Sequence, residues 1–129
     1  MRHNVFVYGT LMQGFGNHYV LGDSFFCGDI DTKYLEFKMY GFYVPAAVQM
    51  PTDEYKKIRG QLYSVNNNTL KRLDYLEGHP HNYKRRLVQL EDDQKALMYL
   101  MDERYAWQFG PCLDTTTDVL SYRELREAF

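Results

Sequence analysis

One glutamate, Glu77, stands out as a side chain that could both take and give a proton. It occupies the last turn of a predicted helix over residues 69–77, which Gly78 ends and Pro80 prevents from resuming. Unsatisfied carbonyls and the negative end of the helix dipole disfavour another negative charge there, so we expect a raised pKa for the Glu77 carboxyl. Burial against an apolar cavity would raise this pKa further, toward neutral pH. The alternative is a surface glutamate beside a capping glycine.

A second candidate is the loop that follows the apolar run at residues 5–8. All four residues of that run are β-branched or aromatic, which predicts a strand covered on both faces. Gly9 can adopt backbone angles that other residues avoid, so the chain can turn sharply and point the N–H groups of Gly9, Thr10 and Leu11 into one space. Such a concavity suits a carboxylate or a phosphate. The alternative is a plain connection after a strand.

The residues around the helix end also include possible metal ligands, namely Glu77, His79 and His81. Pro80 separates the two histidines, and all three ligands flank a turn, whereas the familiar helical site places its histidines at i and i+4. We therefore predict neither a metal nor a cofactor. No Ser, Thr or Cys lies in a nucleophile elbow of the G-x-S-x-G type, so covalent catalysis is not indicated.

A basic triplet, Lys84-Arg85-Arg86, follows Tyr83 on a predicted strand. Alternate members of a strand face opposite sides, so the three cations cannot form one patch, and a solvated strand edge is the simplest interpretation. Tyr83 is better placed to point inward.

The scaffold for these candidates is predicted from periodicity and from turn residues. The predicted elements are a helical turn over 17–22, a half-exposed strand over 33–40, an apolar segment over 42–48 with Pro45 at an edge or bend, a strand over 58–65, the helix over 69–77, a hairpin of strands over 83–90 and 95–101, an irregular segment over 102–118, and a final helix that opens with the capping box Ser121–Glu124 and runs through Leu125 to Phe129. Five or six strands, two or three short helices and no regular βαβ alternation predict an α+β fold, a curled mixed sheet or small β-barrel. The glycines after Tyr8 match neither a P-loop nor a dinucleotide site.

The size and composition predict one globular domain over residues 1–129. Aromatic residues reach 16%, with 12 Tyr and 8 Phe. Such residues can line a cavity whose wall consists of apolar rings and whose few polar groups are tyrosine hydroxyls. The net charge of −2 lacks the basic excess of nucleic-acid-binding proteins, so we expect no nucleic acid partner.

The cellular setting is predicted from two further features. Cys27 and Cys112 are too few for a disulfide framework, which favours a reduced environment. The chain has no apolar signal region near Met1 and no run of 18 apolar residues, so we expect a cytoplasmic protein without a membrane partner. The oligomeric state stays open.

Several of these stretches together resemble the γ-glutamylcyclotransferase-like superfamily, in its AIG2-like and γ-glutamylamine cyclotransferase branch. The matching stretches are Val5–Leu11 with Gly14 and Asn17-His18, Leu73–Gly78 with Pro80, Tyr83 and Arg85, residues 58–65, which are similar to the family strand V-x-G-E-L-Y-x-V but carry Gln61 where Glu is common, and Ala96 with Tyr99, which fit a late A-x-x-Y strand. The resemblance covers about residues 4–100, and the order and spacing of its motifs make it specific. The segment from Asp102 onward is not covered.

The resemblance implies a small β-barrel with flanking helices, whose cavity binds a γ-glutamyl group. In that family, the substrate's α-amine attacks its own γ-carbonyl, which releases an amine or amino acid and forms 5-oxoproline. The implied roles are an acid–base catalyst at Glu77 and substrate contacts at Tyr8, Gly9, Thr10, Leu11 and Tyr83. The leaving group is not defined and could be a free amino acid, an ε-lysine, a polyamine or a modified antibiotic precursor.

Two other functions remain to be weighed against the cyclotransferase. A non-catalytic module could use the same barrel to hold a small ligand or a partner, but a pocket that needs only affinity has no use for a carboxylate at an unfavourable helix end. A nucleic-acid-binding barrel with stacking aromatics fits the tyrosine content but not the charge.

Overall fold

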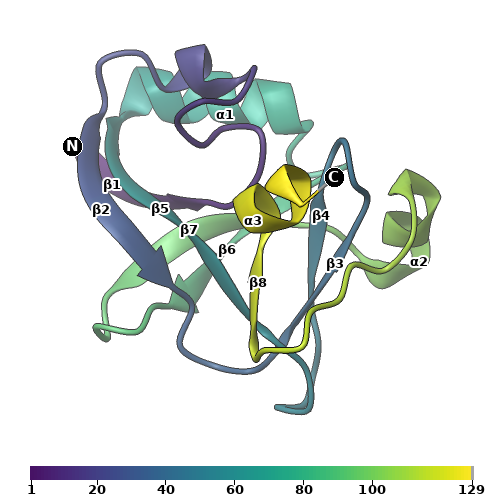
Figure 1. Ribbon diagram of the computed structural model, residues 1–129. Coiled ribbons are helices and arrows are strands. Elements are labelled where there is room, and N and C mark those ends of the chain that lie inside the picture. Colours follow the sequence, from purple (N-terminus) through teal and green to yellow (C-terminus); the bar gives the residue numbers. More distant parts are fainter. Residues whose placement is uncertain (129) are drawn as a thin grey trace.

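The computed structural model describes residues 1–128, and its elements are labelled in Figure 1. The strands are β1 (Arg2–Val7), β2 (Phe25–Asp31), β3 (Phe37–Tyr40), β4 (Ala46–Gln49), β5 (Lys57–Asn66), β6 (Lys84–Gln89), β7 (Lys95–Leu100) and β8 (Val119–Ser121). The helices are η1 (His18–Leu21), α1 (Asn67–Glu77), α2 (Glu103–Ala106), η2 (Trp107–Phe109) and α3 (Tyr122–Glu127), of which η1 and η2 are 3-10 helices.

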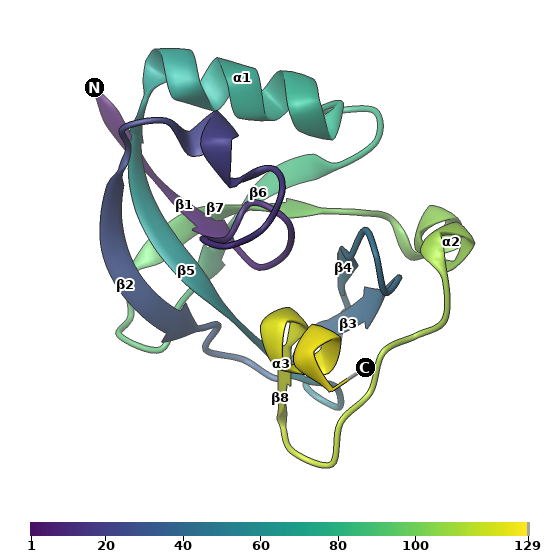
Figure 2. The same cartoon turned by 45° about the horizontal axis from the view of Figure 1, so that its top comes forward.

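A mixed six-stranded sheet forms the main layer. Its order is β2-β5-β1-β7-β6, and β8 pairs with β5. The strand β1 runs antiparallel to β5 and parallel to β7, so the N-terminal strand lies in the middle of the sheet. The strands β3 and β4 form a separate antiparallel pair. Figure 2 shows α1 lying along one side of the main sheet and α2 beyond the β3–β4 pair.

The main sheet is open, which corrects the expectation of a closed barrel. Its two edge strands, β2 and β6, meet only at one end, where Thr32 and Leu90 form a single bridge beyond the strands. A β-bulge between Phe26 and Gly28 interrupts the register of β2, and a bulged strand bends. The α+β class is therefore confirmed, while the closure of the barrel is wrong because the edge strands do not pair along their length within residues 1–128.

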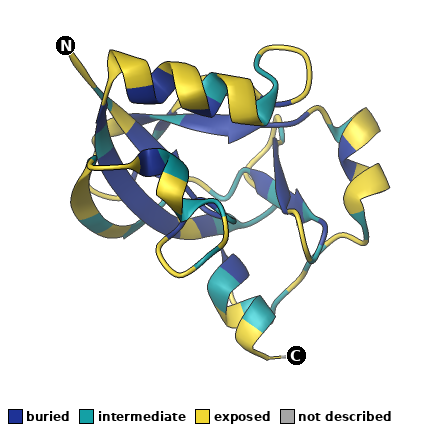
Figure 3. Ribbon diagram, turned by 90° about the horizontal axis from the view of Figure 1, so that it is seen from above, coloured by how far each residue is buried: buried dark blue, intermediate teal, exposed yellow. Residues whose placement is uncertain are grey.

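The centre of the sheet forms the core, as the apolar run predicted. Val5 and Phe6 have no exposed surface, and Val7 and Tyr8 are also buried. The strand itself ends at Val7, so Tyr8 begins the following loop. Figure 3 shows the buried central strands beneath α1, whose outer face is exposed.

The long central elements agree with their predictions. The predicted strand over 58–65 is β5, and the predicted hairpin is formed by β6 and β7. The helix α1 begins after Asn66, whose side chain accepts a hydrogen bond from the Thr69 N–H (2.8 Å), and it ends at Gly78 in the left-handed conformation (φ 65°). The capping residue Ser121 likewise accepts from the Glu124 N–H (3.3 Å). Phe129 lies outside the described residues.

The short and irregular elements differ from their predictions. Only Phe37–Tyr40 of the predicted strand over 33–40 is a strand, because residues 33–36 bend from the main sheet to the β3–β4 pair. The apolar segment over 42–48 contains β4, with Pro45 just before it. The strand β2 and the helix α2 were not predicted: the bulge breaks the alternation of the first, and the second has only four residues.

A glycine on β5 allows this sheet to pack closely. A Cβ atom on Gly60 would lie 2.3 Å from the Val7 carbonyl oxygen and 2.7 Å from Phe6 Cζ. We expect Gly60→Ala to lower the free energy of unfolding by about 1–3 kcal/mol through overpacking, measured by urea titration. Gly16→Ala is the matched control, because no atom lies within 4 Å of the added methyl group and Gly16 has no left-handed φ. Equal stability of the two variants would contradict this close packing.

Candidate active site

A cavity of about 140 Å³ lies where the loop after β1 meets the end of α1. The structure brings to it all the residues predicted for the site, from segments that are far apart in the sequence. We call it the Glu77 cavity; its lining residues are Phe6, Val7, Tyr8, Gly9, Thr10, Leu11, Asn17, Val44, Pro45, Leu76, Glu77, Tyr83 and Tyr99.

Glu77 is the carboxylate of this cavity. Within residues 1–128 its side chain makes no hydrogen bond or ion pair, and it is half-buried at the end of α1. Burial raises the pKa of the Glu77 carboxyl to about 7, because a charged carboxylate loses its hydration there. The predicted direction of the shift is therefore confirmed, and desolvation, the second of the two causes predicted for it, produces the shift. At neutral pH such a group exists in both protonation states and can accept or donate a proton.

Asp74 lies one turn earlier on α1, and its surroundings shift the pKa of its carboxyl in the opposite direction from that of Glu77. The Arg85 guanidinium holds it with two hydrogen bonds (2.9 and 3.2 Å), and the Tyr99 hydroxyl donates a third (2.6 Å). Partial burial alone would raise the pKa of Asp74, but these donors outweigh it, and the pKa lies below its usual value. Asp74 is therefore a fixed anion that positions Arg85 and Tyr99, while Glu77 stays available to a ligand.

Three tyrosines build the apolar wall of the cavity and are held by backbone groups or by Asp74. The Tyr8 hydroxyl donates to the Tyr99 carbonyl (2.7 Å) and accepts from the Ala47 N–H (3.1 Å). The Tyr83 hydroxyl donates to the Pro45 carbonyl (3.0 Å), which confirms that Tyr83 points inward. Burial raises the pKa of Tyr8, Tyr83 and Tyr99, so all three phenols stay protonated at neutral pH. They shape the cavity around Glu77.

The loop after β1 supplies the polar side of the cavity. Within residues 1–128, the N–H groups of Gly9, Thr10 and Leu11 donate to no protein acceptor. Asn17 fixes the loop, since its Nδ2 donates to Thr10 Oγ1 (2.9 Å) and its N–H donates to the Thr10 carbonyl (3.1 Å). These backbone donors can therefore meet a negatively charged ligand group.

A glycine is required at position 9 because Pro45 packs against it, and not because the backbone turns sharply there. Its φ is not left-handed, but a Cβ atom on Gly9 would lie 2.5 Å from Pro45 Cγ. The expectation of an unusual backbone angle at Gly9 is therefore wrong. A glycine at this position lets Pro45 pack against the loop and close one side of the cavity.

The three basic residues of β6 point to opposite faces of the strand, as its alternation predicted. Arg85 turns toward Asp74, whereas Lys84 and Arg86 lie on the other face of β6. His79 accepts a hydrogen bond at Nδ1 from the Arg85 N–H (3.2 Å). Among the described residues, no group of three or more His, Cys, Asp or Glu is placed to hold a metal ion.

Sequence reasoning did not place Tyr99, Pro45 and Asn17 in the site. Asn17 and Tyr99 both belonged to stretches that carried the family resemblance, so a signal for them existed. Pro45 belonged to the apolar segment over 42–48, which was expected to bend there and could lie beside the loop after residue 8, and the structure places Pro45 against Gly9.

The fold and the site together define an α+β protein with a small cavity, which is lined by an unpaired, protonatable glutamate and by a loop with free backbone donors. Residues 5–116 match the family model described as γ-glutamyl cyclotransferase, AIG2-like. The chain belongs to this family, which supports a cyclotransferase-type enzyme.

Two relatives indicate how far the similarity extends. A protein of Methanocaldococcus jannaschii, provisionally named a γ-glutamylcyclotransferase, is 42% identical over 87 residues, which cover 67% of this chain and 70% of that protein. The γ-glutamylaminecyclotransferase C of Danio rerio is 33% identical over 96 residues, which cover 69% of this chain and 62% of the fish protein.

Solved structures agree with the fold. The crystal structure of a mouse AIG2-like protein superposes with a TM-score of 0.72 at 26% identity, covering 90% of this chain and 88% of that one. A protein specific to uropathogenic Escherichia coli shares the fold alone, with a TM-score of 0.80 at 15% identity, and the match covers 100% of this chain and 98% of that one. No helix within residues 1–128 is both long and apolar enough to cross a membrane.

Proposed function

We propose that this protein converts a γ-glutamyl amide or γ-glutamyl amino acid into 5-oxoproline and a free amine or amino acid. The observation that carries the proposal is the unpaired Glu77 carboxyl, whose pKa of about 7 suits proton transfer in both directions. Family membership supports a small γ-glutamyl substrate. A module that only bound a ligand would gain nothing from burying a carboxylate without a partner, because that burial costs stability.

The nucleophile in this reaction belongs to the substrate. The Glu77 carboxylate takes a proton from the α-ammonium group, and the freed amine attacks the γ-carbonyl carbon to close a five-membered ring. The carbonyl oxygen becomes an oxyanion in the tetrahedral intermediate. The attack also leaves the ring nitrogen positively charged, with one proton more than the lactam keeps. When the oxyanion collapses, the bond to the leaving nitrogen breaks and protonated Glu77 gives that nitrogen its proton. The regenerated carboxylate then takes the extra proton from the ring nitrogen and passes it to the released amine, which departs as an ammonium ion. The protein therefore needs no nucleophile of its own.

The loop after β1 binds the polar oxygens of the substrate in this proposal. The free N–H groups of Gly9, Thr10 and Leu11 are donors for either the α-carboxylate or the developing oxyanion, and both are negatively charged. Tyr8 and Tyr83 form the wall against which the carbon chain of the γ-glutamyl group packs, which favours the bent conformer that cyclises.

The test is an assay of 5-oxoproline after incubation with a panel of γ-glutamyl amines and γ-glutamyl amino acids. We expect release from at least one member, with stoichiometric appearance of its amine or amino acid. Binding of panel members in calorimetry without any 5-oxoproline would instead identify a non-catalytic ligand-binding module.

The proposal predicts a pH dependence for kcat/KM. Only deprotonated Glu77 can accept the substrate proton, so kcat/KM should rise with pH and level off above the Glu77 pKa of about 7. Well below that midpoint, each pH unit should cost about tenfold, because the carboxylate fraction falls by that factor. Steady-state rates between pH 5 and pH 8 measure this profile. A rate that is already constant at pH 5 would contradict the role of Glu77.

A further inference from the structure

The Glu77 cavity is smaller than the substrates expected of it. Its volume of about 140 Å³ lies below the roughly 300–1,000 Å³ of most small-molecule sites. A second hollow of about 460 Å³ shares Leu76, Glu77 and Tyr83 with it, so Glu77 lies at the junction of the two. If the proposed function holds, the scissile amide lies at Glu77 and the γ-glutamyl group fills the first cavity. The leaving group must then extend into the second hollow, which we call the Phe109 pocket.

The Phe109 pocket combines an apolar and aromatic wall with the polar side chains of His81, Asn82 and Gln108. Met101, Tyr105 and Phe109 line it together with the shared Leu76 and Tyr83. The Phe109 ring continues the wall of the first cavity, with its centroid 6.3 Å from that of Tyr83. No Lys, Arg or Asp belongs to the lining described for this pocket, and Glu77, the shared catalytic candidate, is its one carboxylate. An aliphatic or aromatic leaving group would bury apolar surface there.

Three cationic side chains lie in a groove that adjoins the Phe109 pocket. The Arg104 guanidinium lies over the Tyr105 ring, 4.9 Å from its centroid, and so already occupies a face that could attract a cation. Beyond Tyr105 lies a groove lined by Lys84, Arg86 and Arg104, which shares His81, Asn82, Met101 and Tyr105 with the pocket.

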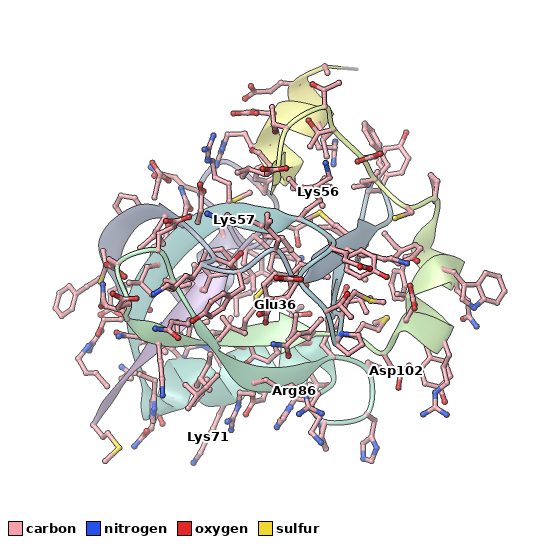
Figure 4. The ribbon with its side chains drawn as sticks, turned by 90° about the horizontal axis from the view of Figure 1, so that it is seen from below. Glu36, Lys56, Lys57, Lys71, Arg86 and Asp102 are labelled. Carbon is pink, nitrogen blue, oxygen red and sulfur yellow. The ribbon has the colours of Figure 1, made fainter. Side chains whose placement is uncertain are left out.

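The acidic residues of this groove are already engaged. Glu103 binds Lys38 (2.8 Å) and Tyr40 (2.9 Å). Asp102 lies 3.5 Å from Arg104 and partly offsets its charge, which leaves Lys84 and Arg86 as the unpaired cations of the groove within residues 1–128. Within residues 1–128, Arg86 forms no ion pair. Figure 4 labels Arg86 on β6 and Asp102 at the start of α2, on the side of the molecule seen from below. A second ammonium group on a leaving amine would approach this cationic end, and like charges repel.

We propose that the Phe109 pocket is the leaving-group subsite and that it selects γ-glutamyl amides whose leaving amine is apolar and carries no second positive charge. This inference rests on the proposed function and narrows its substrate class. Of the leaving groups left open by the sequence, it disfavours polyamines and ε-lysine, because both carry a second ammonium group.

A pair of matched substrates tests the charge preference. γ-Glutamyl-n-pentylamide and γ-glutamyl-4-aminobutylamide have chains of equal length that end in a methyl and an ammonium group. We expect kcat/KM for the pentylamide to be at least about tenfold higher. Equal values or the reverse order, with 5-oxoproline released, would overturn this inference and leave the proposed function standing. No 5-oxoproline from any amide of the panel would overturn both.

Variants of the pocket test its location. Phe109→Ala should lower kcat/KM for the pentylamide at least about tenfold more than for γ-glutamyl-methylamide, whose leaving group is too short to reach the ring. Trp107→Ala is the matched control, because Trp107 is 62% exposed, lies two residues away and lines none of the three hollows. It should leave the ratio between the two substrates unchanged. Equal losses for both substrates in Phe109→Ala would mean a structural role only and would overturn the assignment.

Discussion

Replacing Glu77 by Gln should lower kcat about a thousandfold or more while the fold is preserved. The amide has nearly the size and shape of the carboxyl, but it can neither accept the ammonium proton nor return it to the leaving nitrogen. General acid–base catalysis contributes about 10²–10⁴-fold for one transfer, and here one group serves both. The measurement is 5-oxoproline formation under saturating substrate, with circular dichroism to verify the fold.

Two companion variants make this result specific. Glu77→Asp keeps the carboxyl but withdraws it by one methylene, so it should retain more activity than Glu77→Gln. Glu54→Gln makes the same chemical change at an exposed loop position outside the Glu77 cavity and should leave kcat unchanged. Residual activity of Glu77→Gln within tenfold of the unmodified protein would remove Glu77 from the mechanism.

The sequence predicted those elements whose boundaries are set by local chemistry. Asn66 and Gly78 define α1 through a side-chain cap and a left-handed terminus, and both act within a few residues. The strand β5 was predicted from the alternation of residue types over 58–65, although residues 60–63 in its middle are all buried. Barrel closure was not predictable in this way. It depends on whether β2 and β6 pair along their length, and these two strands come from segments that are far apart in the sequence.

The candidate site was predictable in its residues and less so in its physical causes. Glu77 was singled out for its place at a helix end, with burial as a conditional second cause, and burial is what raises its pKa. Gly9 was singled out for backbone freedom, yet the close approach of Pro45 is what requires glycine. In both cases the decisive neighbour comes from a distant segment, and one sequence does not show which segments meet. The Phe109 pocket was not predicted for a second reason. The helices α2 and η2, which supply part of its lining, lie in a segment without a periodic pattern of apolar residues.

The same Glu77→Gln substitution should stabilise the protein at alkaline pH. The folded-state pKa of Glu77 is about 7 and the ordinary value is 4.5, so between these values the folded protein binds more protons than the unfolded chain. Stability therefore falls as pH rises through this window, because the native state must hold a buried charge above it. Gln carries no charge, so the variant escapes this loss. Allowing for residual exposure, we expect the difference in unfolding free energy between variant and unmodified protein to shift by about 2 kcal/mol in the variant's favour from pH 5 to pH 8.

Urea titrations at the two pH values measure this shift, and Glu54→Gln serves as the control, for which we expect no comparable change. A shift of the opposite sign would mean that folding lowers the Glu77 pKa, as a hidden cationic partner would do. The expected result has a consequence for function. A carboxylate that destabilises the native state at neutral pH, and whose removal stabilises the fold while abolishing turnover, is not a structural residue, because no packing or pairing need explains its presence. Gain of stability and loss of 5-oxoproline release in one variant would therefore link the cost of burying Glu77 directly to its chemistry.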